Sequence, residues 1–447
     1  MLKKKLSVFY VSRISCLIIF AVTLAASPPS MAQESCVTAK CHATMGKAKF
    51  VHGPVAVLDC SPCHQLVPNE KHKFKPIENV GELCSSCHDS MGGKAVVHAP
   101  VAKGQCTACH DPHQSDQRYQ IKKAPISEVC FSCHKRDIIN KKYVHGPAAE
   151  GDCTLCHKPH SSDNPKLLLE SGNNLCFECH SDMKDNFAQA KHIHKPASEQ
   201  CTQCHNPHSN SAKYMLAKDV PDLCYDCHKD IQDHVAKAVV KHGALDIKEK
   251  CLNCHSPHDA PYAKQLKDQP MVLCLSCHDK PIVTEKSGTI EDMKALFEKN
   301  KDWHGPIREK DCSGCHDPHG SANFRILKSY YPQQFYAVFS QSQYELCFSC
   351  HQPTLVQDPR TTTLTGFRDG DRNLHYLHVN REKGRTCRAC HETHASQRPK
   401  HIREAVPFGK WMLPINFVKE PDGGKCSPGC HAPKEYKRTQ ITSEKTK

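Results

Sequence analysis

The sequence predicts a mostly irregular fold with short α-helices and little or no β structure, arranged as an elongated chain of paired motifs. Only 38% of the 447 residues are hydrophobic and 6% aromatic, so side chains alone bury little apolar surface to offset the entropy lost on folding. Thirty prolines and 21 glycines interrupt the chain, and no long segment has the 3.6-residue apolar period of a helix. A cysteine motif also recurs along most of the sequence.

The first 32 residues have the pattern of a secretory signal peptide. Residues 3–5 are lysines, residues 17–26 are apolar, and Ser30-Met31-Ala32 is a small-residue cleavage pattern. An uncleaved membrane anchor is the alternative, which Arg13 disfavours because it shortens the apolar segment. We therefore expect export to the periplasm, with an outer-membrane-associated or extracellular location as alternatives. Residues 33–447 contain no apolar run long enough to span a bilayer, so we expect no transmembrane segment in the mature chain.

The recurring motif is C-x-x-C-H, which occurs thirteen times, with a wider version near each end of the chain. Four residues separate the cysteines before His42, and three separate those before His431. The fifteen pairs are Cys36 and Cys41, Cys60 and Cys63, Cys84 and Cys87, Cys106 and Cys109, Cys130 and Cys133, Cys153 and Cys156, Cys176 and Cys179, Cys201 and Cys204, Cys224 and Cys227, Cys251 and Cys254, Cys274 and Cys277, Cys312 and Cys315, Cys347 and Cys350, Cys387 and Cys390, and Cys426 and Cys430. Cys16 lies in the predicted signal peptide, so no mature cysteine is left for a disulfide.

The motifs come two by two, which predicts the domain organisation. A single motif occupies residues 33–50, five paired repeats follow over residues 51–280, and two expanded repeats with aromatic insertions occupy residues 281–447. Within the five repeats the second motif follows the first by 23 or 24 residues, and within the expanded ones by 35 and 39. We expect short helical turns at the motifs and one longer helix over Ser287–Asn300. The aromatic insertions suggest ordinary packing between widely spaced motifs, with a docking surface as the alternative.

C-x-x-C-H is the attachment motif of a c-type haem. Its two thiols can form thioethers with the two vinyl groups of one porphyrin, and the next histidine becomes the proximal iron ligand. Zinc ribbons also contain C-x-x-C pairs, but a histidine after every pair, an oxidising compartment and the lack of a core argue against zinc. We therefore predict about fifteen covalent haems c. Their proximal ligands are His42, His64, His88, His110, His134, His157, His180, His205, His228, His255, His278, His316, His351, His391 and His431.

Eighteen histidines remain as candidates for distal ligands. One series lies seven to nine residues before the first cysteine of each repeat, and a second lies three residues after the proximal histidine, in C-H-x-x-H. The first repeat lacks the second element, and His72 is the nearest substitute. His401 or His375 would serve the last haem, while His192 and His234 are surplus. The predicted distal ligands are His52, His72, His98, His113, His145, His160, His194, His208, His242, His258, His304, His319, His378, His394 and His401.

The position of the C-H-x-x-H histidines indicates which haem each one serves. Three extended residues span only about 10 Å, too little to pass from one side of a porphyrin to the other. Each of these histidines should therefore bind a neighbouring haem, and we expect each haem pair to be braced by its own ligands. The nine methionines show no such repetition, so histidine–methionine ligation is not expected and low potentials are.

The formal charge of +13 would ordinarily suggest nucleic acid as a partner. Removal of the signal peptide takes away three lysines and one arginine and leaves +9. Fifteen haems add thirty propionates, which bring the total to about −6 when oxidised and about −21 when reduced. The lysines are then counterions for propionates, and we expect redox partners and no nucleic acid.

The unit H-G-P…C-x-x-C-H-x-P-H…L-C-x-x-C-H resembles the doubled-CXXCH multihaem cytochromes over about residues 52–431. The C-terminal portion, which includes NLHYLHVNREKGRTCRACHETHAS and GGKCSPGCH, looks like the ending of such cytochromes from metal-reducing bacteria. The resemblance implies a haem wire for periplasmic or extracellular electron transfer. It implies membrane quinol-oxidising or small periplasmic cytochromes as partners, with an outer-membrane porin as a further candidate.

Saturation of every iron by two histidines predicts electron transfer and no enzyme activity. The alternative is a multihaem reductase with one five-coordinate haem, for which the unusual motifs at Cys36 and Cys426 leave room. A filament of stacked cytochromes is compatible with the first hypothesis.

Overall fold

The computed structural model describes residues 36–284 and 288–439, so the predicted signal peptide lies outside the described residues. The chain divides into two compact units. The N-terminal unit contains the residues up to Asp89 and Lys103–Ala124, and the C-terminal unit contains Ser90–Ala102 and the residues from Pro125 onward. No helix in the described part of the chain is long and apolar enough to cross a membrane.

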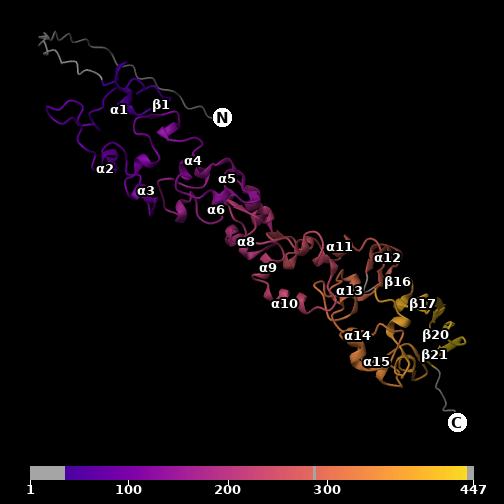
Figure 1. The fold of residues 1–447 in the computed structure, drawn as a ribbon. Coiled ribbons are helices and arrows are strands. Elements are labelled where there is room, and N and C mark those ends of the chain that lie inside the picture. Colours follow the sequence, from indigo (N-terminus) through magenta and orange to yellow (C-terminus); the bar gives the residue numbers. More distant parts are fainter. Residues whose placement is uncertain (1–35, 285–287, 440–447) are drawn as a thin grey trace, which may run out of the picture. The chain divides into compact units, whose positions relative to one another are not determined.

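The helices are short, as the sequence predicts, and none of those described is longer than nine residues (Figure 1). The α-helices are α1 (Gly53–Ala56), α2 (Val80–Ser85), α3 (Ala99–Ala102), α4 (Ser127–Cys130), α5 (Gly146–Glu150), α6 (Asn174–Phe177), α7 (Ser181–Gln189), α8 (Lys195–Glu199), α9 (Asp222–Tyr225), α10 (Lys229–Lys237), α11 (Pro270–Leu275), α12 (Met293–Lys299), α13 (Gly305–Arg308), α14 (Glu345–Phe348), α15 (Thr354–Gln357) and α16 (Leu374–Val379). Helices this short are marginal in isolation, so their stability must come from what packs against them.

Strands are more numerous than the sequence predicts, although most contain two residues. They are β1 (Phe50–Val51), β2 (Val96–Val97), β3 (Gln114–Ser115), β4 (Tyr143–Val144), β5 (Ser161–Ser162), β6 (His192–Ile193), β7 (Ser209–Asn210), β8 (Asp259–Ala260), β9 (Ile282–Thr284), β10 (Gly288–Ile290), β11 (Asp302–Trp303), β12 (Tyr336–Ala337), β13 (Arg368–Asp369), β14 (Arg372–Asn373), β15 (Gly384–Arg385), β16 (Ala395–Ser396), β17 (Ala405–Phe408), β18 (Trp411–Pro414), β19 (Phe417–Glu420), β20 (Gly423–Cys426) and β21 (Lys434–Lys437). The expectation of little or no β structure fails mainly at residues 405–437, where β17 pairs with β18 and β19–β20–β21 form a three-stranded antiparallel sheet.

Every C-x-x-C-H motif forms the same tight turn. In all thirteen, the histidine N–H donates to the carbonyl of the first cysteine at 2.9–3.1 Å. Most first motifs of a repeat form 3₁₀ turns, at Cys106–Ala108, Cys153–Leu155, Cys201–Gln203, Lys250–Asn253 and Cys387–Ala389. Second motifs begin within a short helix, such as α2, α6 or α9. The turn therefore brings the two thiols and the histidine of one motif close together in space.

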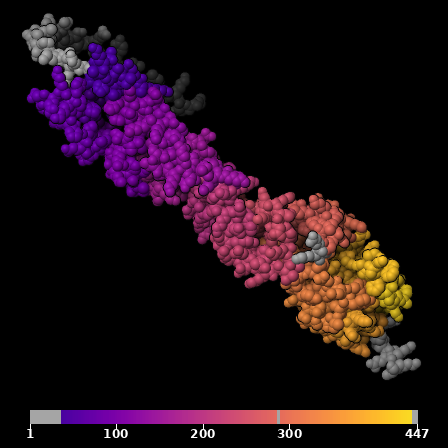
Figure 2. All heavy atoms as spheres, viewed as in Figure 1, coloured from indigo at the N-terminus to yellow at the C-terminus, as the bar shows by residue number. Residues whose placement is uncertain are grey.

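Two-residue antiparallel ladders join most repeats to the next, and a single bridge between Val240 and Ser321 joins the fifth repeat to the sixth. Within the C-terminal unit β2 pairs with β5, β4 with β7, β6 with β8, and β11 with β16. The histidine seven to nine residues before the first cysteine of a repeat is called here the H-G-P-type histidine. Each pairing links the residues just before this histidine in one repeat to those just after C-H-x-x-H of the following one. The repeats of this unit therefore follow one another in sequence order, as the colour gradient from magenta to yellow shows (Figure 2).

In the described chain, clusters of buried apolar residues form only from Met271 onward. One contains Met271, Phe297, Ile307 and Ala395, and the other contains Tyr331, Tyr344, Val356 and Val379. The rings of Tyr331 and Tyr344 meet edge to face at 5.8 Å. These aromatic insertions therefore pack between widely spaced motifs, whereas Trp411 on β18 is 68% exposed.

The predicted helix over Ser287–Asn300 is too long at its start. Ser287 lies outside the described residues, and Gly288–Ile290 form β10, which pairs with β9. The helix α12 begins at Met293 because the Asp292 carboxylate accepts a hydrogen bond from Ala295 N–H at 2.8 Å, which fixes its N-terminus there.

Candidate functional site

The rings of most proximal histidines face the ring of a second histidine. In thirteen such pairs the ring centroids are 5.8–6.5 Å apart, and in twelve of them the ring planes lie within 27° of each other. Metal–imidazole bonds are about 2.0–2.1 Å long and a ring nitrogen lies about 1.1 Å from its ring centre, so two imidazoles on opposite sides of one metal have centroids about 6.3 Å apart. The observed spacing therefore fits one iron between the two rings.

The facing pairs follow one rule along the chain. The pairs, with the proximal histidine first, are His64 with His113, His88 with His52, His134 with His98, His157 with His208, His180 with His145, His205 with His258, His228 with His194, His255 with His319, His278 with His242, His316 with His394, His351 with His304, His391 with His375, and His431 with His378. A second-motif histidine faces the H-G-P-type histidine of its own repeat. A first-motif histidine faces the C-H-x-x-H histidine of the following repeat, except in the last repeat.

The C-H-x-x-H histidines thus lie opposite a neighbouring motif's histidine and not their own, as the length of the connection requires. The expectation that these histidines brace their own pair is wrong, however. They connect one repeat to the preceding one, as His208 does with His157. Within a repeat, the two motifs are connected by the H-G-P-type histidine. His145, for example, faces His180 of its own repeat.

The local backbone holds the proximal rings of six first motifs in one orientation. The Nδ1 atom of His157 lies 2.9 Å from the carbonyl oxygen of Lys166, nine residues later, and His205 has the same contact with Tyr214. Lys166 and Tyr214 have φ values of 57° and 59°, a left-handed conformation that turns the carbonyl back toward the ring. A ring that donates from Nδ1 leaves Nε2 as the atom that can bind a metal.

The same contact recurs at other first-motif proximal histidines and was not foreseen from the sequence. The carbonyls belong to Tyr119 for His110, Lys264 for His255, Arg325 for His316 and Lys400 for His391, at 2.7–3.0 Å. Each of these four residues also has a positive φ between 54° and 62°. At all six positions the residue is lysine, arginine or tyrosine, so the available signal was this residue type at a constant spacing of nine residues.

Four of the H-G-P-type histidines, namely His98, His145, His194 and His242, are oriented by the proline of C-H-x-P-H. His145 Nδ1 lies 3.0 Å from the carbonyl oxygen of Pro207, and His194 Nδ1 lies 2.9 Å from that of Pro257. The backbone adds a second contact, because His145 N–H donates to the carbonyl of His208 at 2.9 Å. The short helix that follows carries proline in its first turn, where a missing N–H costs nothing. One repeat therefore positions the distal histidine of the repeat before it.

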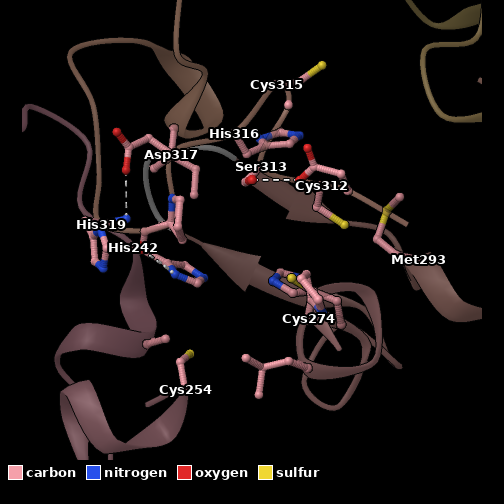
Figure 3. A pocket seen from close by; sticks show the side chains of 18 of the residues that line it. His242, Cys254, Cys274, Met293, Cys312, Ser313, Cys315, His316, Asp317 and His319 are labelled. Atoms are coloured by element: carbon pink, nitrogen blue, oxygen red, sulfur yellow. Dashed lines mark hydrogen bonds between the residues drawn. The ribbon is translucent and has the colours of Figure 1, made fainter. Parts of the chain in front are cut away.

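Sulfur atoms of successive motifs also approach one another. Hydrogen bonds join the first cysteines of neighbouring motifs across a repeat boundary, as between Cys274 and Cys312, and between Cys347 and Cys387. A hydrogen bond from Cys224 lowers the pKa of Cys251 to about 7. In Figure 3 the side chains of Cys274 and Cys312 turn toward the same space, beside the rings of His242 and His316.

Second cysteines approach each other within a repeat. Burial, and after it the negative charge of a nearby Cys179 thiolate, raises the pKa of Cys156. The same two causes act on Cys204 beside Cys227. Contacts between and within repeats therefore alternate along the chain.

A continuous cavity of about 5180 Å³ runs through the C-terminal unit. It is lined by both cysteines and the histidine of nine motifs, from the one that begins at Cys176 to the one that begins at Cys426. Each motif thus has about 580 Å³, within the range of about 300–1,000 Å³ that small-molecule sites occupy. The chain folds around a space that fits one porphyrin per motif, which explains how so polar a sequence forms a compact unit.

Burial favours the neutral form of several facing rings in the C-terminal unit. It lowers the pKa of His375 and of His394 to about 4, and it also lowers the pKa of His242 and His316. A neutral imidazole keeps the lone pair that a metal requires.

Two predicted distal ligands do not face a proximal histidine in the structure. His375, and not His401, lies opposite His391, at 6.3 Å, because α16 carries it there. His401 turns its Nδ1 atom toward the carbonyl oxygen of Asp302 at 3.2 Å and meets His304 edge to face. His72 is exposed in a turn, and the first repeat needs no substitute because His113 already faces His64.

The other predicted residues lie as follows. The His160 carbonyl accepts a backbone hydrogen bond from His98 N–H at 2.9 Å, and the carbonyls of His113, His208, His258 and His394 accept the corresponding bond. The surplus residue His234 lies 3.1 Å from the Asp317 carboxylate, and His192 belongs to β6. His42 is exposed and faces no ring among residues 36–284 and 288–439.

Comparison with known families matches this geometry. The sequence model of the doubled CXXCH motif matches residues 52–93, 98–138, 145–185, 194–233, 242–282 and 304–355, which together exceed half of the chain. The chain belongs to the doubled CXXCH motif family. Every matched segment of this doubled CXXCH protein begins at an H-G-P-type histidine and continues past the second motif. No curated protein matches the chain.

Membership in the family identifies the cofactor. The repeated motifs bind haem c covalently, and the protein is a multihaem c-type cytochrome. The match does not include the motif at Cys36 or the last repeat. The last repeat nevertheless keeps the facing pairs, because His378 lies 6.5 Å from His431 and His394 lies 6.1 Å from His316.

Proposed function

We propose that this doubled CXXCH protein transfers electrons through about fifteen covalently bound haems, nearly all held by two histidines, in periplasmic or extracellular respiration. The thirteen facing histidine pairs carry the proposal. Residues that occupy both axial positions of an iron leave no position for a substrate, so the metal can only gain or lose an electron. Haem supplies that one-electron couple, while the protein sets its ligands and surroundings.

The closeness of successive haem-attachment motifs supports electron transfer from one haem to the next along the chain. First cysteines touch across repeat boundaries and second cysteines approach within repeats, so the attachment points of successive porphyrins are neighbours. The cavity of the C-terminal unit connects nine motifs without an intervening layer of protein. Closely spaced redox centres allow an electron to pass from one to the next without a mobile carrier.

The surroundings of the ligands support low reduction potentials. Two histidines replace the histidine–methionine pair that raises potentials in other cytochromes c. Nδ1 contacts with backbone carbonyls, as at His157 and His205, make each imidazole a stronger donor to iron. Haems of low potential suit electron exchange with membrane quinol-oxidising or small periplasmic cytochromes. An outer-membrane porin is a further candidate partner.

The test combines intact mass with electron paramagnetic resonance of the oxidised holoprotein. Mass should show about fifteen haems and a chain that begins after residue 32, and at least thirteen haems should give low-spin signals. Several high-spin haems would contradict the proposal. Catalytic reduction of nitrite or another small oxyanion would favour a reductase, the alternative that an open iron would allow.

A further inference from the structure

The N-terminal motif occupies a definite place in the repeat. Where a second motif meets the first motif of the following repeat, their first cysteines are hydrogen-bonded, as Cys84 is to Cys106 and Cys176 to Cys201. Cys36 is hydrogen-bonded to Cys60 in the same way. The motif that ends at His42 therefore corresponds to the second motif of a repeat.

Second motifs take their facing histidine from a fixed distance upstream. In the five regular repeats this histidine lies 30–32 residues before the first cysteine of the second motif, as His52 does before Cys84. The corresponding positions before Cys36 are residues 4–6, which are Lys-Lys-Leu. None of residues 1–41 is a histidine, so the repeat provides no distal ligand for the N-terminal haem.

Nearby residues do not replace the missing ligand. His52 faces His88, and His64 faces His113. Met45 follows His42 by three residues, which span about 10 Å and cannot pass around a porphyrin to the other side of its iron. His72 is exposed in its own turn, and within the described chain no ring lies opposite His42.

We propose that the haem on Cys36, Cys41 and His42 has an open sixth coordination position that binds small ligands of haem iron, namely diatomic gases in the ferrous state and small anions such as cyanide in the ferric state. The inference rests on the proposed function, because it requires a haem at this motif. Cys36, Cys41 and His42 are all exposed, so this motif would hold its haem at the protein surface, where small ligands arrive from solvent. The other wide motif differs, because His378 already faces His431.

The test uses the full-length holoprotein, fully reduced and titrated with carbon monoxide, alongside spectra of the oxidised form. We expect one carbon monoxide per protein and one high-spin ferric haem in about fifteen. The double variant Cys36→Ser/Cys41→Ser should lose one haem by mass together with all carbon monoxide binding. The matched variant Cys426→Ser/Cys430→Ser should lose one haem and still bind carbon monoxide.

A further variant tests whether His72 binds the iron of the N-terminal haem. His72→Ala should leave the carbon monoxide stoichiometry and the high-spin signal unchanged. A wild-type protein that binds no carbon monoxide, with a new high-spin haem in His72→Ala, would overturn the inference and assign His72 as the ligand. A low-spin haem that becomes high-spin on dilution would also overturn it, because a second copy would then supply the ligand. A mass without a haem at Cys36 overturns the inference but leaves the proposed function of the other motifs intact.

Discussion

At the scale of single residues, what decides each site is a pair of histidines from different parts of the chain. The ring of His208 lies 6.0 Å from that of His157 with an interplanar angle of 9°, although 51 residues separate them. The sequence predicts both histidines as ligands and predicts that His208 serves another motif's haem. The prediction that this haem belongs to the same repeat is wrong, because nothing in the spacing distinguishes the preceding repeat from the same one.

The substitution His208→Ala tests this assignment. It should convert one haem from low to high spin, namely the haem on Cys153 and Cys156, because His157 loses its facing ring. Electron paramagnetic resonance of the oxidised protein measures the change.

Two double cysteine variants, each of which lacks one haem, identify the haem that His208→Ala changes. In Cys153→Ser/Cys156→Ser, adding His208→Ala should create no new high-spin signal, because the affected haem is already gone. In Cys201→Ser/Cys204→Ser the new signal should persist. The reverse pattern would show that His208 binds the haem of its own motif.

Single residues also show where sequence reasoning stops. His375 and His401 are both near the C-terminal motif in sequence, and only α16 places the first of them opposite His391. The carbonyls of Lys166 and Tyr214 act through a backbone conformation, which the identity of one side chain does not encode. Ligand type was predictable from motif chemistry, whereas ligand pairing depends on tertiary contacts.

At the scale of elements, helices and ladders only a few residues long bring these ligands together. The motif turns were predictable, because C-x-x-C-H imposes them locally. The ladders were not, because a two-residue strand such as β4 or β7 is too short to show the alternation that identifies strands in a sequence. The four-residue strands β17–β21 were missed as well, although they are long enough to show some alternation.

The helix α16 shows how one polar residue supports two sites. Asn373 is completely buried, and its side-chain oxygen accepts from His375 N–H at 3.0 Å and from Tyr376 N–H at 3.2 Å. Its amide donates to the carbonyls of Leu355 and Asp358 at 2.9 and 2.8 Å. The cap thereby fixes the helix that carries His375 and His378.

Substitution Asn373→Ala should therefore destabilise the C-terminal unit by about 2–4 kcal/mol, the combined cost of a lost N-cap and two buried carbonyls without donors. The midpoint of chemical denaturation measures the loss. Asn373→Asp keeps the accepting oxygen but turns a buried negative charge toward the carbonyls of Leu355 and Asp358, so it should destabilise the unit at least as much as alanine does. Equal midpoints for Asn373→Ala and the wild type would show that α16 does not depend on its cap.

At the scale of the whole molecule, the cofactors take the place of a conventional core. The C-terminal unit encloses about 5180 Å³ between its motifs, while its two apolar clusters involve few side chains and lie only in its later part. Composition already indicated this, since 38% hydrophobic residues cannot fill such a unit. Close packing is the usual state of protein interiors, and a space of this size would collapse or admit water if nothing filled it.

The apoprotein should therefore fail to fold even though the motif turns are encoded locally. Production in a host that lacks haem attachment should give a chain without cooperative thermal unfolding, because helices of four to nine residues are marginal without partners. The haem-loaded protein should unfold in a cooperative transition, and calorimetry compares the two. The variant Cys426→Ser/Cys430→Ser is the control, because it removes one haem at the end of the chain and should keep that transition. A cooperative transition in the apoprotein would show that the chain supplies its own core, and that the cavity is a binding site formed before haem attachment.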